Sequence, residues 1–129
     1  MNKIFIEVSV GELLDKISIL EIKKDKVKDP NKLSFILDEL SKLKDELQKN
    51  VKSNATLDDL HQSLKIINLR LWDIEDEKRK CEKEKDFTER FIKLSRDVHI
   101  LNDDRAKIKL EINNHTGSII KEIKEYTGY

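Results

Sequence analysis

The sequence predicts an all-α protein, an antiparallel helical bundle of about four helices that occupies a single domain over residues 1–129. Its 129 residues include only three Gly and one Pro, so few positions disfavour a helix. Charged residues make up 40% of the chain, and long unbranched side chains such as Lys and Glu lose little conformational entropy in a helix. Between Leu57 and Ile112, apolar residues return every three or four positions, which is the period of a helix with one buried face.

The N-terminal half of the chain should form two helices after a short extended segment. Residues 4–8 are β-branched and aromatic, so they indicate an extended conformation, although the sequence offers no partner strand. Ser9 can cap the first helix, which we therefore expect to begin at Val10. Because proline suits the first position of a helix, the second helix should run from Pro30 to about Lys52.

The C-terminal half should form a long hairpin of two helices that resembles a coiled coil. The third helix, capped by Thr56, and the fourth helix, capped by Asp86, each carry an apolar seam over roughly 30 residues. At about 1.5 Å per residue, such a hairpin is about 40 Å long. The fourth helix should end after Asn113, and Ser118 can cap a short terminal helix through Glu125. A seam longer than one subunit can bury favours a dimer.

Arg105 is the most informative residue of this predicted hairpin. It occupies a seam position between Leu101 and Ile108, where a permanent charge must find partners or destabilise the fold. One interpretation is an ion pair that fixes the register of the helices, and the other is a binding site for phosphate or carboxylate. The expected partners lie on the facing helices or one turn away: Asn68, Asn102, Asp15 and Glu21.

A second polar cluster lies beside the seam of the third helix. Trp72, Glu75, Asp76 and Arg79 lie three, four or seven positions apart, so they can share one helix face. They can form a packing anchor with surface ion pairs, or one wall of a ligand groove. Asp76 is about nine residues, or about 13 Å, from the level of Arg105, so the two clusters can flank one groove but cannot form one tight site.

The composition and motifs argue against several classes of function. With 26 basic and 26 acidic residues the net charge is zero, so nucleic acid is not an expected partner. No apolar stretch has the length that spans a membrane, and the single cysteine, Cys81, suits a reducing cytoplasm. The three histidines lack the spacing of metal ligands, and no phosphate loop or catalytic motif is present. We therefore expect no metal and no cofactor, and the sequence leaves open whether the chain is an enzyme.

Four blocks of the sequence resemble a known family. They read I-F-I-E-V-S-V-G-E-L-L-D-K-I-S-I-L-E-I-K from Ile4, L-W-D-I-E-D-E-K-R from Leu71, N-D-D-R-A-K-I-K from Asn102 and G-S-I-I-K-E-I-K-E-Y from Gly117. Together they resemble the uncharacterised bacterial and phage family called domain of unknown function 6165. The resemblance covers nearly the whole chain and implies no activity. It marks the motif positions as the first places to look for function: Asp15, Lys16, Glu21, Trp72, Glu75, Asp76, Arg79, Asn102, Arg105 and Tyr126.

Long apolar seams without a catalytic set favour a cytoplasmic protein that acts through protein contacts, as a homodimer. The alternative is a small enzyme or ligand-binding domain that holds a phosphorylated or carboxylated small molecule in a polar groove near Arg105. In that case the residues of the two clusters and the family positions are the candidate ligand-binding residues.

Overall fold

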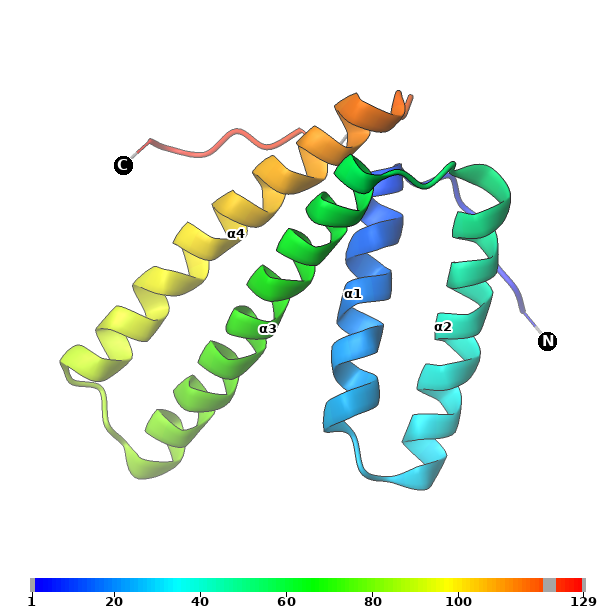
Figure 1. Ribbon diagram of the computed structural model, residues 1–129. Coiled ribbons are helices and arrows are strands. Elements are labelled where there is room, and N and C mark those ends of the chain that lie inside the picture. The colour runs from blue at the N-terminus through cyan, green and yellow to red at the C-terminus, as the bar shows by residue number, and fades with distance from the viewer. Residues whose placement is uncertain (1, 120–122, 129) are drawn as a thin grey trace.

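The computed structural model describes residues 2–119 and 123–128, and its described residues contain four helices and no strand. The helices are α1 (Val10–Lys26), α2 (Pro30–Asn50), α3 (Ala55–Glu84) and α4 (Glu89–Thr116), as Figure 1 shows. The all-α fold with its long α3/α4 hairpin is thus confirmed. Residues 2–8 precede α1 without forming a helix or a strand.

Side-chain caps define the starts of the first two helices as the sequence predicts. Ser9 Oγ accepts a hydrogen bond from the backbone N–H of Glu12 at 3.0 Å, and α1 begins at Val10. Asp29 Oδ1 accepts one from a backbone N–H at the start of α2, and Pro30 occupies the first helical position.

The predicted caps of the last two helices are wrong by two residues. α3 is capped by Asn54, whose Oδ1 accepts a hydrogen bond from the N–H of Leu57 at 2.9 Å, because Asn is a stronger cap than the predicted Thr56. At the tip of the hairpin, Asp86 Oδ1 accepts a hydrogen bond from the N–H of Thr88 at 3.1 Å. This carboxylate therefore stabilises the turn, and Thr88 becomes the N-cap of α4.

The predicted terminal helix from Ser118 to Glu125 is not found in the described residues of this stretch, and residues 120–122 lie outside them. α4 ends at Thr116, and its C-cap Gly117 has a φ of 69°, a left-handed conformation that suits glycine. Beyond it, Ile119 is 98% exposed and Ile123 is 90% exposed. A helix this short is unstable in water unless it packs on another element, and these side chains have no such contact.

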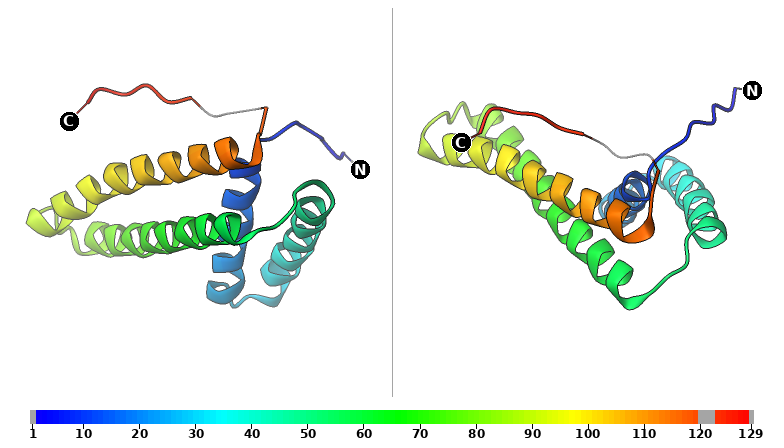
Figure 2. Two further views of the ribbon diagram at one scale, coloured as in Figure 1. Left: turned by 45° about the horizontal axis from the view of Figure 1, so that its top comes forward. Right: turned by 90° about the horizontal axis from the view of Figure 1, so that it is seen from above.

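Helix α1 is the centre of the molecule. It lies against each of the other three helices, whereas α2 packs chiefly on α1. Figure 2 shows that α1 crosses the α3/α4 hairpin steeply, near the open end of the hairpin, and that the tip projects away from α1 and α2. The outer half of the hairpin is therefore left uncovered by the first two helices.

Two apolar clusters on either side of α1 form the core. One joins α1 to α3 and α4, and the other joins α1 to α2. The first contains Leu14, Leu57, Leu64 and Ile112, and the second contains Ile17, Leu20 and Leu40.

The start of α1 lies unusually close to α4, and Gly11 makes this possible. Its N–H donates a hydrogen bond to Asn113 Oδ1 at 2.8 Å. A Cβ at position 11 would lie 2.7 Å from the backbone oxygen of Lys109 and 2.9 Å from Asn113 Oδ1. Next to it, the N–H of Val10 donates to Ser118 Oγ at 3.3 Å. Residues at the end of α4 thus satisfy N–H groups that a helix start leaves unpaired.

We predict that Gly11→Ala destabilises the protein by about 1–3 kcal/mol, because the added methyl group would collide with the α4 backbone. The loss should occur although alanine favours a helix over glycine by about 1 kcal/mol. Urea unfolding followed by circular dichroism measures the difference. Gly128→Ala is the matched control, since no atom of the described residues lies within 4 Å of a Cβ at that position. Equal stability of the Gly11→Ala protein and the wild type would contradict the close approach of α1 to α4.

Candidate functional site

The carboxylate of Asp15 is the centre of a polar network between α1, α3 and α4. Its side chain is only 2% exposed. Arg105 Nε donates a hydrogen bond to Asp15 Oδ1 at 3.0 Å, and Arg105 Nη2 donates to Asp15 Oδ2, so the guanidinium holds both oxygens. Of the two acids that the sequence offers as partners of Arg105, the structure therefore places Asp15 against it.

Asn68 and Asn102 also belong to this network, but only Asn102 accepts a hydrogen bond from Arg105. Asn68 Nδ2 donates to Asp15 Oδ1 and to Ser18 Oγ, both at 2.8 Å. Asn102 Oδ1 accepts a hydrogen bond from Arg105 Nη1 at 3.3 Å. Asn68 thus reaches the same network as Arg105, but as a donor to the carboxylate and not as an acceptor for the guanidinium.

Lys109 belongs to this network, and the sequence analysis missed it. Its Nζ lies 2.7 Å from Glu12 Oε2 and 3.5 Å from Asp15 Oδ2, and its side chain is 9% exposed. Because it follows Arg105 by four positions, it faces the same side of α4, and this spacing is the signal that could have identified it. Two carboxylates and two cations balance the charge of the network.

The pKa of the Asp15 carboxyl is lowered from its ordinary value of 3.8. Burial alone would raise it, because a charged group loses hydration in the interior. Hydrogen bonds from Arg105 and Asn68, and the positive charges of Arg105 and Lys109, outweigh that effect. The carboxylate is therefore ionised at neutral pH, and the network is a set of charges and not of neutral groups.

An open groove of about 500 Å³ lies beside the network, where α1 diverges from α3. Its apolar surface comes from the C-terminal half of α1 and from the middle of α3, and charged side chains surround it. The lining residues are Ile19, Ile22, Asn68, Leu71, Trp72, Glu75, Asp76, Arg79 and Arg105. The structure thus brings the Arg105 cluster and the Trp72 cluster to one groove, as two separate parts of its wall.

The groove charges farther from Arg105 have few partners within the protein. Asp76 lies 3.6 Å from Lys80 in a solvent-exposed ion pair. Glu75 and Arg79 form no ion pair or side-chain hydrogen bond with any residue that the structure describes. These two side chains are therefore available to a partner, in contrast to the guanidinium of Arg105.

Besides Asp15 and Asn102, which belong to the network, three family positions lie outside the groove. Glu21 lies 3.2 Å from Lys65 Nζ and 3.7 Å from His61 Nε2, on another part of the contact between α1 and α3. Lys16 is exposed, and Tyr126 is exposed in the C-terminal segment. None of the three lines the groove.

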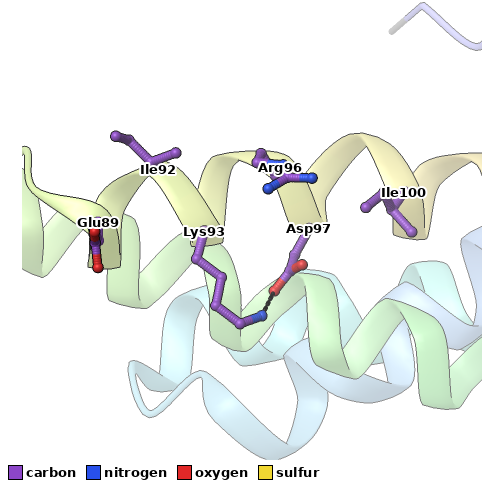
Figure 3. A pocket seen from close by; sticks show the side chains of 6 residues that line it. All are labelled: Glu89, Ile92, Lys93, Arg96, Asp97 and Ile100. Carbon is purple, nitrogen blue, oxygen red and sulfur yellow. Dashed lines mark hydrogen bonds and ion pairs between the residues drawn. The ribbon is translucent and has the colours of Figure 1, made fainter. Parts of the chain in front are cut away.

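A second hollow lies on the outer face of α4, and Figure 3 shows it from close by. Its volume is also about 500 Å³, but all of its lining residues belong to this one helix. They are Glu89, Ile92, Lys93, Arg96, Asp97 and Ile100, with an ion pair of 2.7 Å between Lys93 and Asp97. The face of a single helix does not enclose a ligand, so the groove at Trp72 is the better candidate.

Neither a metal centre nor a membrane span is found among residues 2–119 and 123–128. No three His, Cys, Asp or Glu side chains in this part of the chain are placed to share a metal ion. None of its helices combines the length and the apolar character needed to cross a membrane.

We predict that Arg105→Met destabilises the protein by about 3–5 kcal/mol, because it leaves the buried Asp15 carboxylate without its main partner. Urea unfolding measures this loss. The double variant Asp15→Asn, Arg105→Met should lose less free energy of unfolding than the two single variants lose in sum. Arg79→Met is the matched control, since this arginine also lines the groove, and we expect a change within about 0.5 kcal/mol. If Arg105→Met changes the free energy of unfolding as little as Arg79→Met does, the ion pair of Arg105 with Asp15 does not hold the helices together.

His61 makes the stability depend on pH near neutrality. Its Nε2 is buried and has no hydrogen-bond partner among the described residues. Burial lowers the pKa of this imidazole below its ordinary value of 6.5, although the charge of Glu21 opposes the change. The unfolded chain therefore binds a proton more readily, and the free energy of unfolding should fall as the pH drops through 6.5.

The prediction is that His61→Gln makes the stability less dependent on pH than in the wild type. Urea unfolding at several pH values between about pH 7.5 and pH 5 measures the slope, since glutamine cannot take up the proton. If both proteins lose stability with the same slope, His61 is not the responsible group.

Residues 4–129 match a family described as "Family of unknown function (DUF6165)". No curated protein and no solved structure matches the chain significantly. The match extends over the ion network, the groove and the C-terminal segment alike. The chain therefore belongs to the DUF6165 family, a family of unknown function.

Proposed function

We propose that the protein acts through protein contacts, as a cytoplasmic homodimer, and that the groove at Trp72 is the contact surface. The observation that supports this proposal is the composition of the groove. An apolar strip from Ile19, Leu71 and Trp72 is partly exposed to solvent between charged side chains. Aromatic and aliphatic side chains inside a charged rim are typical of protein interfaces. A buried free thiol at Cys81 is consistent with the cytoplasm.

The same groove is less suited to a small anion near Arg105. Arg105 directs Nε and Nη2 to Asp15 and Nη1 to Asn102, so each of its three nitrogens donates a hydrogen bond inside the protein. A phosphate or carboxylate in the groove would also approach Glu75 and Asp76, with Arg79 as the cation beside them. The charges therefore favour a mixed protein surface over an anionic ligand.

Nucleic acid is also disfavoured, because cations at the tip of the hairpin are paired with acids. Arg90 forms ion pairs with Glu77, Glu84 and Asp86. Lys80 lies 3.2 Å from Glu77 Oε1. Phosphate groups would have to displace these internal contacts and would meet the same carboxylates.

Light scattering tests the proposal over a range of protein concentrations. We expect twice the mass of one chain for the wild type and a single-chain mass for Trp72→Asp, because a charge in the apolar strip opposes its burial. Glu75 is exposed and has no ion pair within the described part of the chain, so Glu75→Arg should weaken the dimer without affecting the fold, which circular dichroism checks.

Ile92→Asp is the control, since Ile92 is also exposed but lies in the hollow on α4. A dimer that survives Trp72→Asp but dissociates with Ile92→Asp would assign the contact to α4 instead. A wild type that stays monomeric at every concentration would overturn the proposal. Thermal unfolding with phosphates and dicarboxylates tests the alternative, since a ligand at about 100 times its Kd stabilises by about 2.7 kcal/mol.

A further inference from the structure

We infer that the groove of one chain receives the C-terminal segment, residues 119–126, of a second copy, and that this segment becomes helical there. The inference rests on the proposed homodimer and identifies the part of the partner that fills the groove. Both the groove and the segment expose apolar side chains in the single chain. The groove exposes Leu71 and Trp72 in part, and the segment exposes Ile119 and Ile123 almost fully.

The sequence of the segment is amphipathic when it is arranged as a helix. At about 100° per residue, its four apolar side chains fall on one stripe, its two lysines on one flank and its two glutamates on the other. These residues are Ile119, Ile120, Ile123 and Tyr126 for the stripe, Lys121 and Lys124 for one flank, and Glu122 and Glu125 for the other. A helix with such a stripe binds in an apolar groove by burying the stripe.

The dimensions and charges of the groove match this helix. From Asn68 to Arg79 the groove extends about 16 Å along α3, and a helix of residues 119–126 is about 11 Å long. The α3 wall carries the carboxylates of Glu75 and Asp76, with Arg79 one turn beyond Glu75. The lysine flank of the segment would face this wall.

The opposite wall is apolar, but the lysines that follow it on α1 suit the glutamate flank. Lys23 and Lys26 follow the groove residues Ile19 and Ile22 by one turn of α1. Lys26 Nζ lies 3.9 Å from Asp73 across the two walls. The helix can lie in the groove in two directions. In one of them its lysine flank faces the carboxylates of α3 and its glutamate flank faces the lysines of α1.

The reach of the chain requires that the segment come from a second copy. Ser118 is held at the end of α4 by its hydrogen bond to the N–H of Val10. The groove begins at the level of Arg105, which is 12 residues before Gly117 and hence about 18 Å away along α4. Consecutive Cα atoms are about 3.8 Å apart, so residue 119 of the same chain cannot begin a helix at that level. A second copy has no such constraint, and each chain can fill the groove of the other.

The N-terminal segment is the rival occupant. Phe5 is 89% exposed, and Figure 2 shows that both terminal segments leave the molecule from the same corner. Residues 4–8 lack the helical spacing of apolar residues and carry Glu7 as their only charge. Residues 119–126 therefore match the shape and the charges of the groove better than residues 4–8 do.

The first test uses the full-length double variant Ile119→Asp, Ile123→Asp in light scattering. Both side chains are exposed in the single chain, so the variant should fold normally, and we expect it to be monomeric at concentrations where the wild type is dimeric. Phe5→Asp is the matched control and should remain a dimer. If the double variant stays dimeric while Trp72→Asp dissociates, the inference is wrong and the proposed function stands. If Phe5→Asp alone dissociates, the N-terminal segment is the occupant. A wild type that is always monomeric overturns both proposals.

The second test adds a synthetic peptide of residues 117–129 to the monomeric double variant. Trp72 is the only tryptophan of the chain and lines the groove, so its fluorescence reports directly on occupancy. We expect saturable binding with a shift of emission to shorter wavelength, because the peptide excludes water from the indole ring. A peptide with Lys121→Glu and Lys124→Glu should bind about tenfold more weakly or worse, through repulsion by the α3 wall. Absence of any emission change with the unmodified peptide would overturn the inference.

Discussion

A buried carboxylate determines how the two hairpins of this protein are joined. Asp15 is ionised inside the contact between three helices, so it must find donors on both α3 and α4. Arg105 and Asn68 supply them in one register only, because a shift of α1 by one turn would leave buried charges unpaired. Gly11, one turn before Asp15, brings α1 close to the backbone of α4 at Lys109 and so supports the same register.

The position of this contact has a consequence for the surface of the protein. Because the network joins α1 to Asn68 in the middle of α3 and to Arg105 in the C-terminal half of α4, α1 is held there and then diverges from α3. The divergence exposes Leu71 and Trp72, which would be covered in a closed bundle of four helices, where all helices stay side by side. Arg105 thus fixes the helices and also forms one end of the groove. Both the network and the groove therefore follow from the angle at which α1 crosses the α3/α4 hairpin.

The sequence predicted the parts of this structure that depend on local pattern. Apolar spacing identified the four helices, and the charge of Arg105 within a seam suggested an ion pair with Asp15 or Glu21 of α1 as one of two interpretations; the structure selects Asp15. The close approach at Gly11 was not predictable, because it depends on residues of α4 that lie about 100 positions away. Lys109 was missed for a related reason. Its spacing of four residues from Arg105 places it on the same face of α4, but its burial depends on the path of α1 across α4.

The groove differs in character along its length, and this difference constrains what can occupy it. At one end the guanidinium of Arg105, with a side chain that is 27% exposed, already has Asp15 and Asn102 as partners. An apolar group can cover this end at modest cost, since the charge keeps its hydrogen bonds and its attraction to Asp15 strengthens as water leaves. At the other end, Glu75 and Arg79 would lose hydration without compensation unless the occupant brings charges of its own. A purely apolar partner therefore fits only the Arg105 end, and an occupant of the whole groove must combine an apolar stripe with charged flanks.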